Sequence, residues 1–156
     1  MNAVVLFESM FGNTETIARA VAEGLSAKLK VDVMRIDGTP VDVSEADLLV
    51  FGGPTHAFGM SRLNTRQAAQ RQGAPDADPK STGLREALQR LPPGSSTPVA
   101  VFDTRVNKPR LPGSAAHGAM KRLRKLGYKA VSKPKSFHVD GTSGPLIAGE
   151  ENRARE

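Results

Sequence analysis

The feature that most constrains this chain is the polar stretch SMFGNT at residues 9–14, which separates an apolar run from an amphipathic one. The run before it, AVVLF, is typical of a buried strand. The run after it, TIARAVAEGL, has apolar residues at helical spacing and predicts a helix that begins near Asn13. A strand that turns directly into a helix directs free backbone N–H groups and the positive end of the helix dipole toward one point. The stretch therefore predicts an anion site.

The residue types in this stretch suit a phosphate group held by neutral donors. Ser9 and Thr14 supply hydroxyl groups, and Asn13 supplies an amide. Gly12 lets the backbone pass close to a bound group. The stretch has neither the lysine of a GxxxxGK[ST] loop nor the glycine spacing of GxGxxG, which leaves a terminal phosphomonoester as the ligand. A turn of this composition is equally compatible with a helix cap that binds nothing.

Apolar runs and amphipathic stretches alternate along the rest of the chain. Strands are predicted at 3–7, 31–36, 47–51, 98–102 and from 130 toward 139, and helices after 13, from 82 or 83 to 91, and from 114 to 127. Short, continuously apolar strands between helices are typical of a parallel sheet buried on both faces. The polar stretch 62–80 contains two prolines and no clean period, which predicts a long excursion with at most one short helix. A short closing helix is expected at the end of the chain.

Composition narrows the class of protein. A chain of 156 residues with 38% hydrophobic residues suits a single domain over 1–156. No run approaches the roughly 18 apolar residues of a membrane span, and the first strand begins without a leader, so we expect a cytoplasmic protein with no membrane partner. The absence of cysteine excludes disulfides and cysteine catalysis. The spacing of the three histidines predicts no metal site.

Charge is unevenly distributed along the chain. The formal net charge is +6, and the segment from Thr104 to Lys135 contains ten Lys or Arg residues but no Asp or Glu. One edge of the molecule is therefore expected to be positive. The segment is compatible with a solvated helix face, or with attraction of an anionic substrate, an acidic protein or a nucleic acid. Apart from Tyr128, no aromatic residue interleaves the cations, which disfavours nucleic acid.

From residue 5 to residue 21, VLFESMFGNTETIARAV resembles the N-terminal signature of the flavodoxin family. The constrained positions of that signature are filled here by Val5, Leu6, Phe7, Ser9, Gly12, Thr14, Ala18 and Val21. The resemblance implies a doubly wound, flavodoxin-like α/β fold in three layers, with a five-stranded parallel sheet in the order 2-1-3-4-5. It also implies FMN as the cofactor, bound where strands 1 and 3 diverge.

The resemblance further implies that FMN contacts three loops and that no side chain of the protein is catalytic. Gly52 and Gly53 are expected to let the backbone lie against the flavin ring, and the residues from 103 to 105 are expected in a loop after the fourth strand. The implied cofactor-binding residues are Ser9, Met10, Phe11, Gly12, Asn13 and Thr14 in the first loop, Pro54, Thr55, His56, Ala57, Phe58 and Gly59 in the second, and Asp103, Thr104 and Arg105 in the third.

The sequence departs from the family pattern in two respects. Electron-transfer flavodoxins commonly place the ring between a tryptophan and a tyrosine, whereas this chain has no Trp and one Tyr, Tyr128, near the fifth strand. Weaker stacking and modest FMN affinity are expected. Family electron carriers are usually acidic, whereas this chain is basic. Arg105 and the cations behind it are expected to favour the reduced flavin anion and make the flavin less strongly reducing.

Two functions from different classes follow. The first is an FMN-binding redox protein, either an electron carrier or a quinone-reductase-like oxidoreductase, that passes electrons to a partner protein or a small-molecule acceptor. The alternative is a binding module that keeps the fold without retaining flavin and uses its basic face for an acidic partner. A phosphate-receiver module is excluded because the third strand ends in Gly52 and Gly53 rather than in acidic residues.

Overall fold

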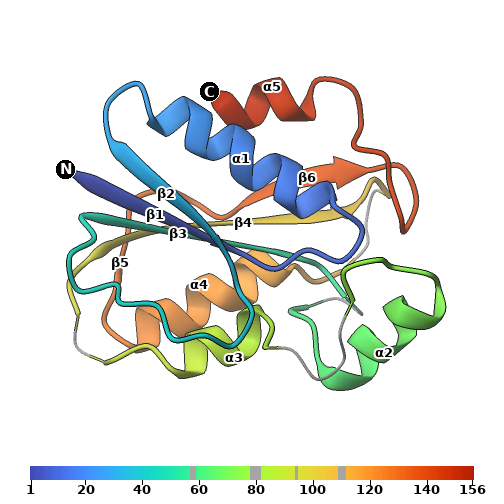
Figure 1. The fold of residues 1–156 in the computed structure, drawn as a ribbon, viewed down its shortest axis with the longest axis horizontal. Coiled ribbons are helices and arrows are strands. Elements are labelled where there is room, and N and C mark those ends of the chain that lie inside the picture. Colours follow the sequence, from blue (N-terminus) through green and yellow to red (C-terminus); the bar gives the residue numbers. More distant parts are fainter. Residues whose placement is uncertain (57–58, 78–81, 94, 109–111) are drawn as a thin grey trace.

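The computed structural model describes residues 1–56, 59–77, 82–93, 95–108 and 112–156. Strands and helices alternate along this part of the chain around one central sheet (Figure 1). The strands are β1 (Asn2–Phe7), β2 (Lys30–Arg35), β3 (Leu48–Pro54), β4 (Pro98–Val106), β5 (Lys129–Ala130) and β6 (Lys135–Val139). The helices are α1 (Asn13–Leu25), α2 (Leu63–Arg71), α3 (Leu84–Gln89), α4 (Ala115–Lys125) and α5 (Glu150–Arg155).

The sheet has the topology that the sequence predicts. All strand pairs are parallel and follow the order β2-β1-β3-β4-β5, with β6 also paired to β4. Helices α1 and α5 cover one face, and α3 and α4 cover the other (Figure 1). The expected flavodoxin-like, three-layer, doubly wound fold is confirmed.

Strands 4 and 5 differ from the sequence prediction. The predicted fifth strand is divided into β5 and β6, and Pro134 lies between them because it has no N–H to donate to the ladder. β6 pairs with Phe102–Val106, which extends β4 four residues beyond its predicted end. Asp103, Thr104 and Arg105 therefore belong to a strand, and their expected position in a loop was wrong.

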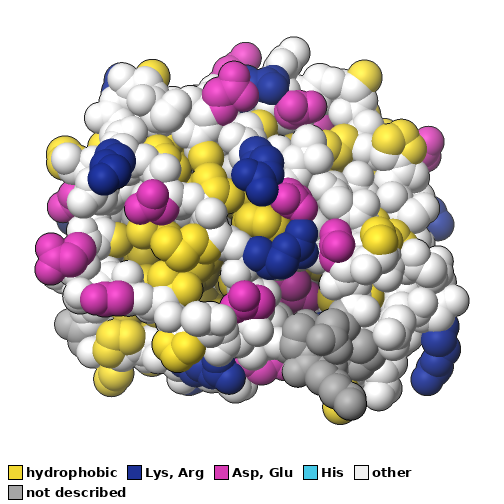
Figure 2. Space-filling view, in the orientation of Figure 1, with side chains coloured by type: hydrophobic (Ala, Val, Ile, Leu, Met, Phe, Trp, Pro, Cys, Tyr) yellow, Lys and Arg dark blue, Asp and Glu magenta, His cyan; other side chains and the backbone are white. Residues whose placement is uncertain are grey.

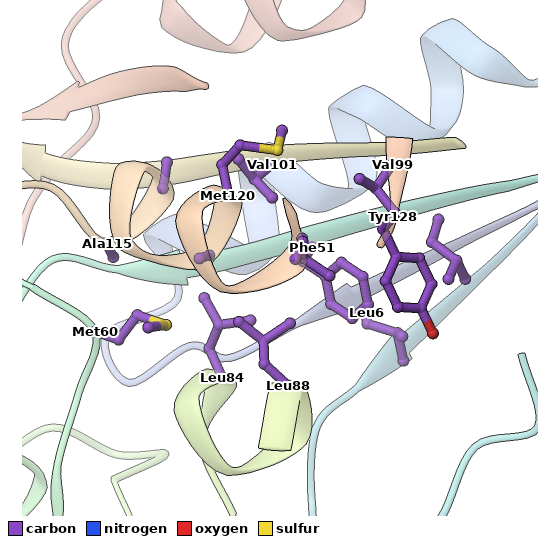
Figure 3. Packing of buried hydrophobic residues seen from close by; sticks show 14 of the residues in the cluster. Leu6, Phe51, Met60, Leu84, Leu88, Val99, Val101, Ala115, Met120 and Tyr128 are labelled. Atoms are coloured by element: carbon purple, nitrogen blue, oxygen red, sulfur yellow. The ribbon is translucent and has the colours of Figure 1, made fainter. Parts of the chain in front are cut away.

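The core lies on both faces of the sheet. Leu6 and Phe51 point toward α3 and α4, where they pack with Met120 and neighbouring apolar residues (Figure 3). Val5 and Phe102 belong to the cluster on the other face, under α1 and α5. Both faces of the strands are therefore buried, as the continuously apolar strands predict. No helix in the described residues is both long enough and apolar enough to cross a bilayer.

The two glycines at the end of β3 serve packing within the protein. A Cβ on Gly52 would lie 2.0 Å from Cζ of Phe102, and one on Gly53 would lie 3.0 Å from a methyl carbon of Leu84. The space beside each glycine is thus filled by a core side chain. Packing against Phe102 and Leu84 therefore accounts for both glycines, and the expected approach of their backbone to a flavin ring stays a prediction.

We predict that Gly52→Ala destabilises the protein by about 1–3 kcal/mol, because the added methyl group overlaps the Phe102 ring. Gly118→Ala is the matched control. It lies inside α4, where a Cβ would meet only Cε of Met60 at an ordinary 3.6 Å, so it should stabilise by about 0.5–1 kcal/mol through helix propensity. Urea unfolding measures both free energies. Equal stabilities of Gly52→Ala and the wild type would contradict the packing role.

Candidate functional site

A cleft of about 360 Å³ opens at the carboxyl ends of the central strands. Residues that follow β1, β3 and β6 and the last residues of β4 line it, as expected for a ligand site where the connections from neighbouring strands diverge. Its lining from these segments is Met10, Phe11, Asn13, Thr14, Pro54, Thr55, His56, Thr104, Arg105, Val106, Pro112, Val139 and Thr142.

Helix α2 supplies a further wall of the cleft that the sequence analysis missed. Thr65, Ala68, Ala69 and Gln72 line the cleft from this helix and its C-cap position. They are spaced at i, i+3, i+4 and i+7, so they form one helical stripe. The sequence does contain this helical spacing, but the residues at these positions are small or polar. They therefore do not form the apolar stripe by which a helix is usually predicted. The prediction of at most one short helix in the excursion agrees with α2 over the described residues, and positions 78–80 lie outside them.

The turn from β1 into α1 has the geometry of an anion site. Gly12, the N-cap of α1, has φ 95°, a left-handed conformation that favours glycine. The Ser9 hydroxyl oxygen accepts from the backbone N–H groups of Gly12 (3.2 Å) and Glu15 (3.3 Å) and so shapes the turn. Within the described part of the chain, the N–H groups of Phe11, Asn13 and Thr14 have no acceptor. These three donors are therefore available to a ligand.

Side chains tie this turn to two other parts of the cleft. The Thr14 and Thr104 hydroxyl oxygens lie 2.7 Å apart in a buried hydrogen bond between α1 and β4. Because two hydroxyl groups share one hydrogen in that bond, one hydroxyl hydrogen remains for a ligand. The Asn13 amide donates to the backbone oxygen of Ser143 at 3.1 Å. The turn is thus fixed against both β4 and the segment after β6.

An acidic residue in the first turn of α1 is neutralised by its neighbours. Glu15 accepts from Arg19 at 2.9 Å and from Arg35 at 2.6 Å. Arg35 also donates to the backbone oxygen of Ser9 at 2.9 Å. The carboxylate therefore does not cancel the attraction of the helix N-terminus for an anion. Arg35 also lies 3.6 Å from a carboxylate oxygen of Asp76, so two carboxylates of the protein share its charge.

Asp103 is fully buried in β4 and is not among the residues that line the cleft. Its Oδ2 accepts from the Thr55 hydroxyl (3.1 Å), the backbone N–H of Ala116 (3.0 Å) and the Ser114 hydroxyl. This carboxylate therefore connects the segment after β3 with the start of α4. Its Oδ1 is buried and has no hydrogen-bond partner in the described residues.

His56 lines the cleft and is the last described residue before positions 57 and 58 in the sequence. Burial disfavours the imidazolium and lowers the pKa of His56, and the nearby Arg66 guanidinium lowers it further, against a hydrogen bond to the Thr65 backbone. The ring is therefore neutral at neutral pH. The backbones of His56 and Gly59 exchange hydrogen bonds of 2.7 and 2.9 Å. The predicted contacts of Ala57 and Phe58 fall outside the described residues.

The structure brings most of the predicted site residues together. Ser9 and Gly12 shape the turn, while Asp103 and Gly59 lie outside the lining. Tyr128 is buried in the core and donates to the Pro92 backbone oxygen. The predicted residues that line the cleft are Met10, Phe11, Asn13, Thr14, Pro54, Thr55, His56, Thr104 and Arg105.

Comparison with known proteins gives one family match and a set of similar folds. Residues 5–91 match the family model described as Flavodoxin. No curated protein sequence matches the chain. The crystal structure of oxidised Flavodoxin 2 from Bacillus cereus is 19% identical, with a TM-score of 0.69 over 99% of this chain and 93% of that one. A Streptococcus pneumoniae TIGR4 flavodoxin is 21% identical, with a TM-score of 0.68 over 99% and 93%.

A larger protein shares the same fold over part of its length. The Flv1 flavodiiron core from Synechocystis sp. PCC6803 is 19% identical, with a TM-score of 0.65 over 100% of this chain and 34% of that one. At these identities the structural likeness shows the fold. The family match spans the turn after β1, all of β3 and the α2 wall.

We predict that His56 makes stability depend on pH. The pKa of His56 is lowered in the folded state, so its neutral form contributes stability that is present above the unfolded value of about 6.5 and is lost as pH falls below it. The loss is at most about 1.4 kcal/mol per pH unit. Urea unfolding of wild type and His56→Asn between pH 5 and about 8 measures it. Identical pH profiles of the two proteins would contradict the prediction.

Proposed function

The chain belongs to the flavodoxin family, and on that premise we propose that it binds FMN in the cleft and passes electrons to a redox partner. When bound, FMN supplies one- and two-electron chemistry. The protein holds the cofactor, orients it and sets the charge around it. The acceptor is a partner protein or a small molecule that reaches the open side of the cleft.

The observation that most supports FMN is the set of unpaired donors at the start of α1. The N–H groups of Phe11, Asn13 and Thr14 and one hydroxyl hydrogen of the Thr14–Thr104 pair are available beside the cleft. This donor set fits a terminal phosphomonoester without a lysine in the turn. The phosphate of FMN would bind here, and the cleft would extend from this point along the remainder of the cofactor.

The side chains that line the cleft suit a flat ring held with few aromatic contacts. Among the described lining residues, Phe11 and His56 carry the aromatic rings. The α2 stripe is small or polar, and Thr55 adds a hydroxyl. Stacking is therefore weaker than between a tryptophan and a tyrosine, which supports modest FMN affinity.

Arg105 is the charged group most relevant to the flavin potential. It lines the cleft half-buried, whereas the neutral form of His56 adds no charge at neutral pH. A cation at this position stabilises the reduced, anionic flavin more than the oxidised one. We therefore propose a hydroquinone that is less strongly reducing than in acidic family members.

The alternative of a binding module rests on the basic segment. On the face shown in Figure 2, Lys and Arg side chains are interspersed with Asp and Glu. By contrast, the outer face of α4 and β5 presents exposed Lys121, Arg122, Arg124, Lys125 and Lys129. Salt-sensitive binding of an acidic protein by a chain that does not bind FMN would favour this alternative.

We predict that the double variant Asn13→Ala, Thr14→Val binds FMN about 10- to 100-fold more weakly than the wild type, because it removes the Thr14 hydroxyl beside the phosphate and the Asn13 amide that ties the turn to the Ser143 backbone oxygen. Riboflavin, which lacks the phosphate, should lose little affinity. Absorbance titration of the flavin-free protein measures both.

Thr16→Val is the matched control for this double variant. Its hydroxyl donates to the Gly12 backbone oxygen in the same turn of the helix and does not line the cleft. It should bind FMN as the wild type does. A wild-type protein that binds no FMN would refute the proposed cofactor.

We predict that Arg105→Gln lowers the midpoint potential of the hydroquinone couple by tens of millivolts, since about 59 mV in a one-electron couple corresponds to about 1.4 kcal/mol. Lys125→Gln removes a cation at the far end of α4 and should leave the potential within a few millivolts of the wild type because of screening. Spectroelectrochemical titration with FMN bound measures the potentials. Equal shifts in both variants would show that net charge, and not Arg105, sets the potential.

A further inference from the structure

A buried polar network lies between the start of the phosphate turn and α2. It consists of Glu8, Ser61, Arg66 and Glu86, and the first three are at most 6% exposed. Glu8, the residue after β1, accepts from the Leu84 backbone N–H at 2.7 Å and from the Ser61 hydroxyl at 2.5 Å. Burial raises the pKa of Glu8. The end of β1 is thus bonded to α3 and to the residue that leads into α2.

Arg66 extends this buried polar network into α2. It is 4% exposed, and its Nη1 donates to the Ser61 hydroxyl oxygen at 2.9 Å. Its two terminal nitrogens also donate to the two carboxylate oxygens of Glu86, at 2.6 and 3.3 Å. A bidentate pair of this kind fixes orientation as well as distance. One side chain of α2 therefore contacts both α3 and the group that holds Glu8.

Gly83 shows how tightly this network is enclosed. Its φ of −100° is accessible to any residue, so the backbone does not require glycine here. A Cβ at this position, however, would lie 2.5 Å from a Glu8 carboxylate oxygen and 2.6 Å from an Arg66 nitrogen. The network therefore occupies the space of a side chain, and its members have little freedom to move apart.

Apart from Arg66, α2 has few anchoring contacts, one of which is the hydrogen bond between His56 and the Thr65 backbone. Its buried residues are Arg66 and Ala69, and Ala69 packs in a small cluster with Met10, Ala74 and Ala77. A nine-residue helix is marginal by itself, and an alanine buries little apolar area. The position of α2 relative to the sheet therefore depends on Arg66 to a large degree.

Resting on the proposed function, we propose that Arg66 is a positioning residue for the cofactor. It does not line the cleft. It holds α2 so that the stripe of Thr65, Ala68, Ala69 and Gln72 forms a wall against the flavin ring.

The test compares flavin binding and amide exchange in Arg66→Met with those in Arg71→Met. Arg71 is an exposed cation in the last turn of the same helix and is the matched control. Arg66→Met should bind FMN and riboflavin each about tenfold more weakly, with their affinity ratio unchanged, because the ring wall is displaced and the phosphate turn is not. Hydrogen–deuterium exchange should accelerate over residues 63–71 and stay unchanged in α1. Arg71→Met should match the wild type.

Two conservative variants separate positioning from loss of fold, because Arg66→Met leaves the buried Glu8 and the partly buried Glu86 without a cation. Arg66→Lys should recover part of the affinity and the protection of α2. Glu86→Gln keeps a hydrogen-bond acceptor while removing one charge. It should reduce the affinity for FMN and for riboflavin less than Arg66→Met does. Circular dichroism establishes that each variant is folded.

The results distinguish failure of the positioning role of Arg66 from failure of the proposed FMN binding. If the wild type binds FMN and Arg66→Met binds both flavins equally well, the positioning role is overturned while the proposed function stands. If Arg66→Met loses only FMN affinity, Arg66 acts on the phosphate, and the wall assignment is overturned. If the wild type binds neither flavin, the proposed function fails, and with it the cofactor role of Arg66, whereas faster exchange over 63–71 would still show that Arg66 holds α2.

Discussion

The cleft depends first on how β1 turns into α1. Gly12 adopts a left-handed conformation that brings the start of the helix directly against the end of the strand. The Ser9 hydroxyl then holds two of the backbone N–H groups of the turn, which leaves others free beside the cleft. The Thr14–Thr104 hydrogen bond fixes this arrangement to β4. A residue with a Cβ at position 12 would strain the turn and misplace every donor that follows it.

Patterns that are local in the sequence predicted the fold and the turn at residues 9–14, whereas contacts between distant segments decided the rest of the structure. The apolar strands and the signature from Val5 to Val21 are local, and the topology agreed with them. The end of β4 was missed because Asp103 and Thr104 are polar. The Asp103 carboxylate accepts a hydrogen bond from the start of α4, and the Thr104 hydroxyl is hydrogen-bonded to Thr14 on α1. Both are compatible with a buried strand only once those partners are present.

The α2 wall was missed for a related reason. Its cleft-facing stripe of Thr, Ala and Gln has no apolar period, because it faces a cleft rather than the core. Its main anchor is Arg66, a residue type that is almost never fully buried without a partner. That partner, Glu86, lies twenty positions away on α3. Cleft-facing helices held by ion pairs therefore leave little trace in hydrophobic periodicity.

The basic charge of the chain acts at two separate places. Lys129 of β5 pairs with Pro98, the first residue of β4, and Arg105 lies seven residues further along that strand, at the cleft. That is roughly 25 Å, well beyond a Debye length of about 8 Å at physiological ionic strength. Lys129 therefore has little influence on the energy of a charge inside the cleft. The net charge of +6 bears instead on the approach of acidic partners, so the potential at the cleft and the attraction of a partner can change independently.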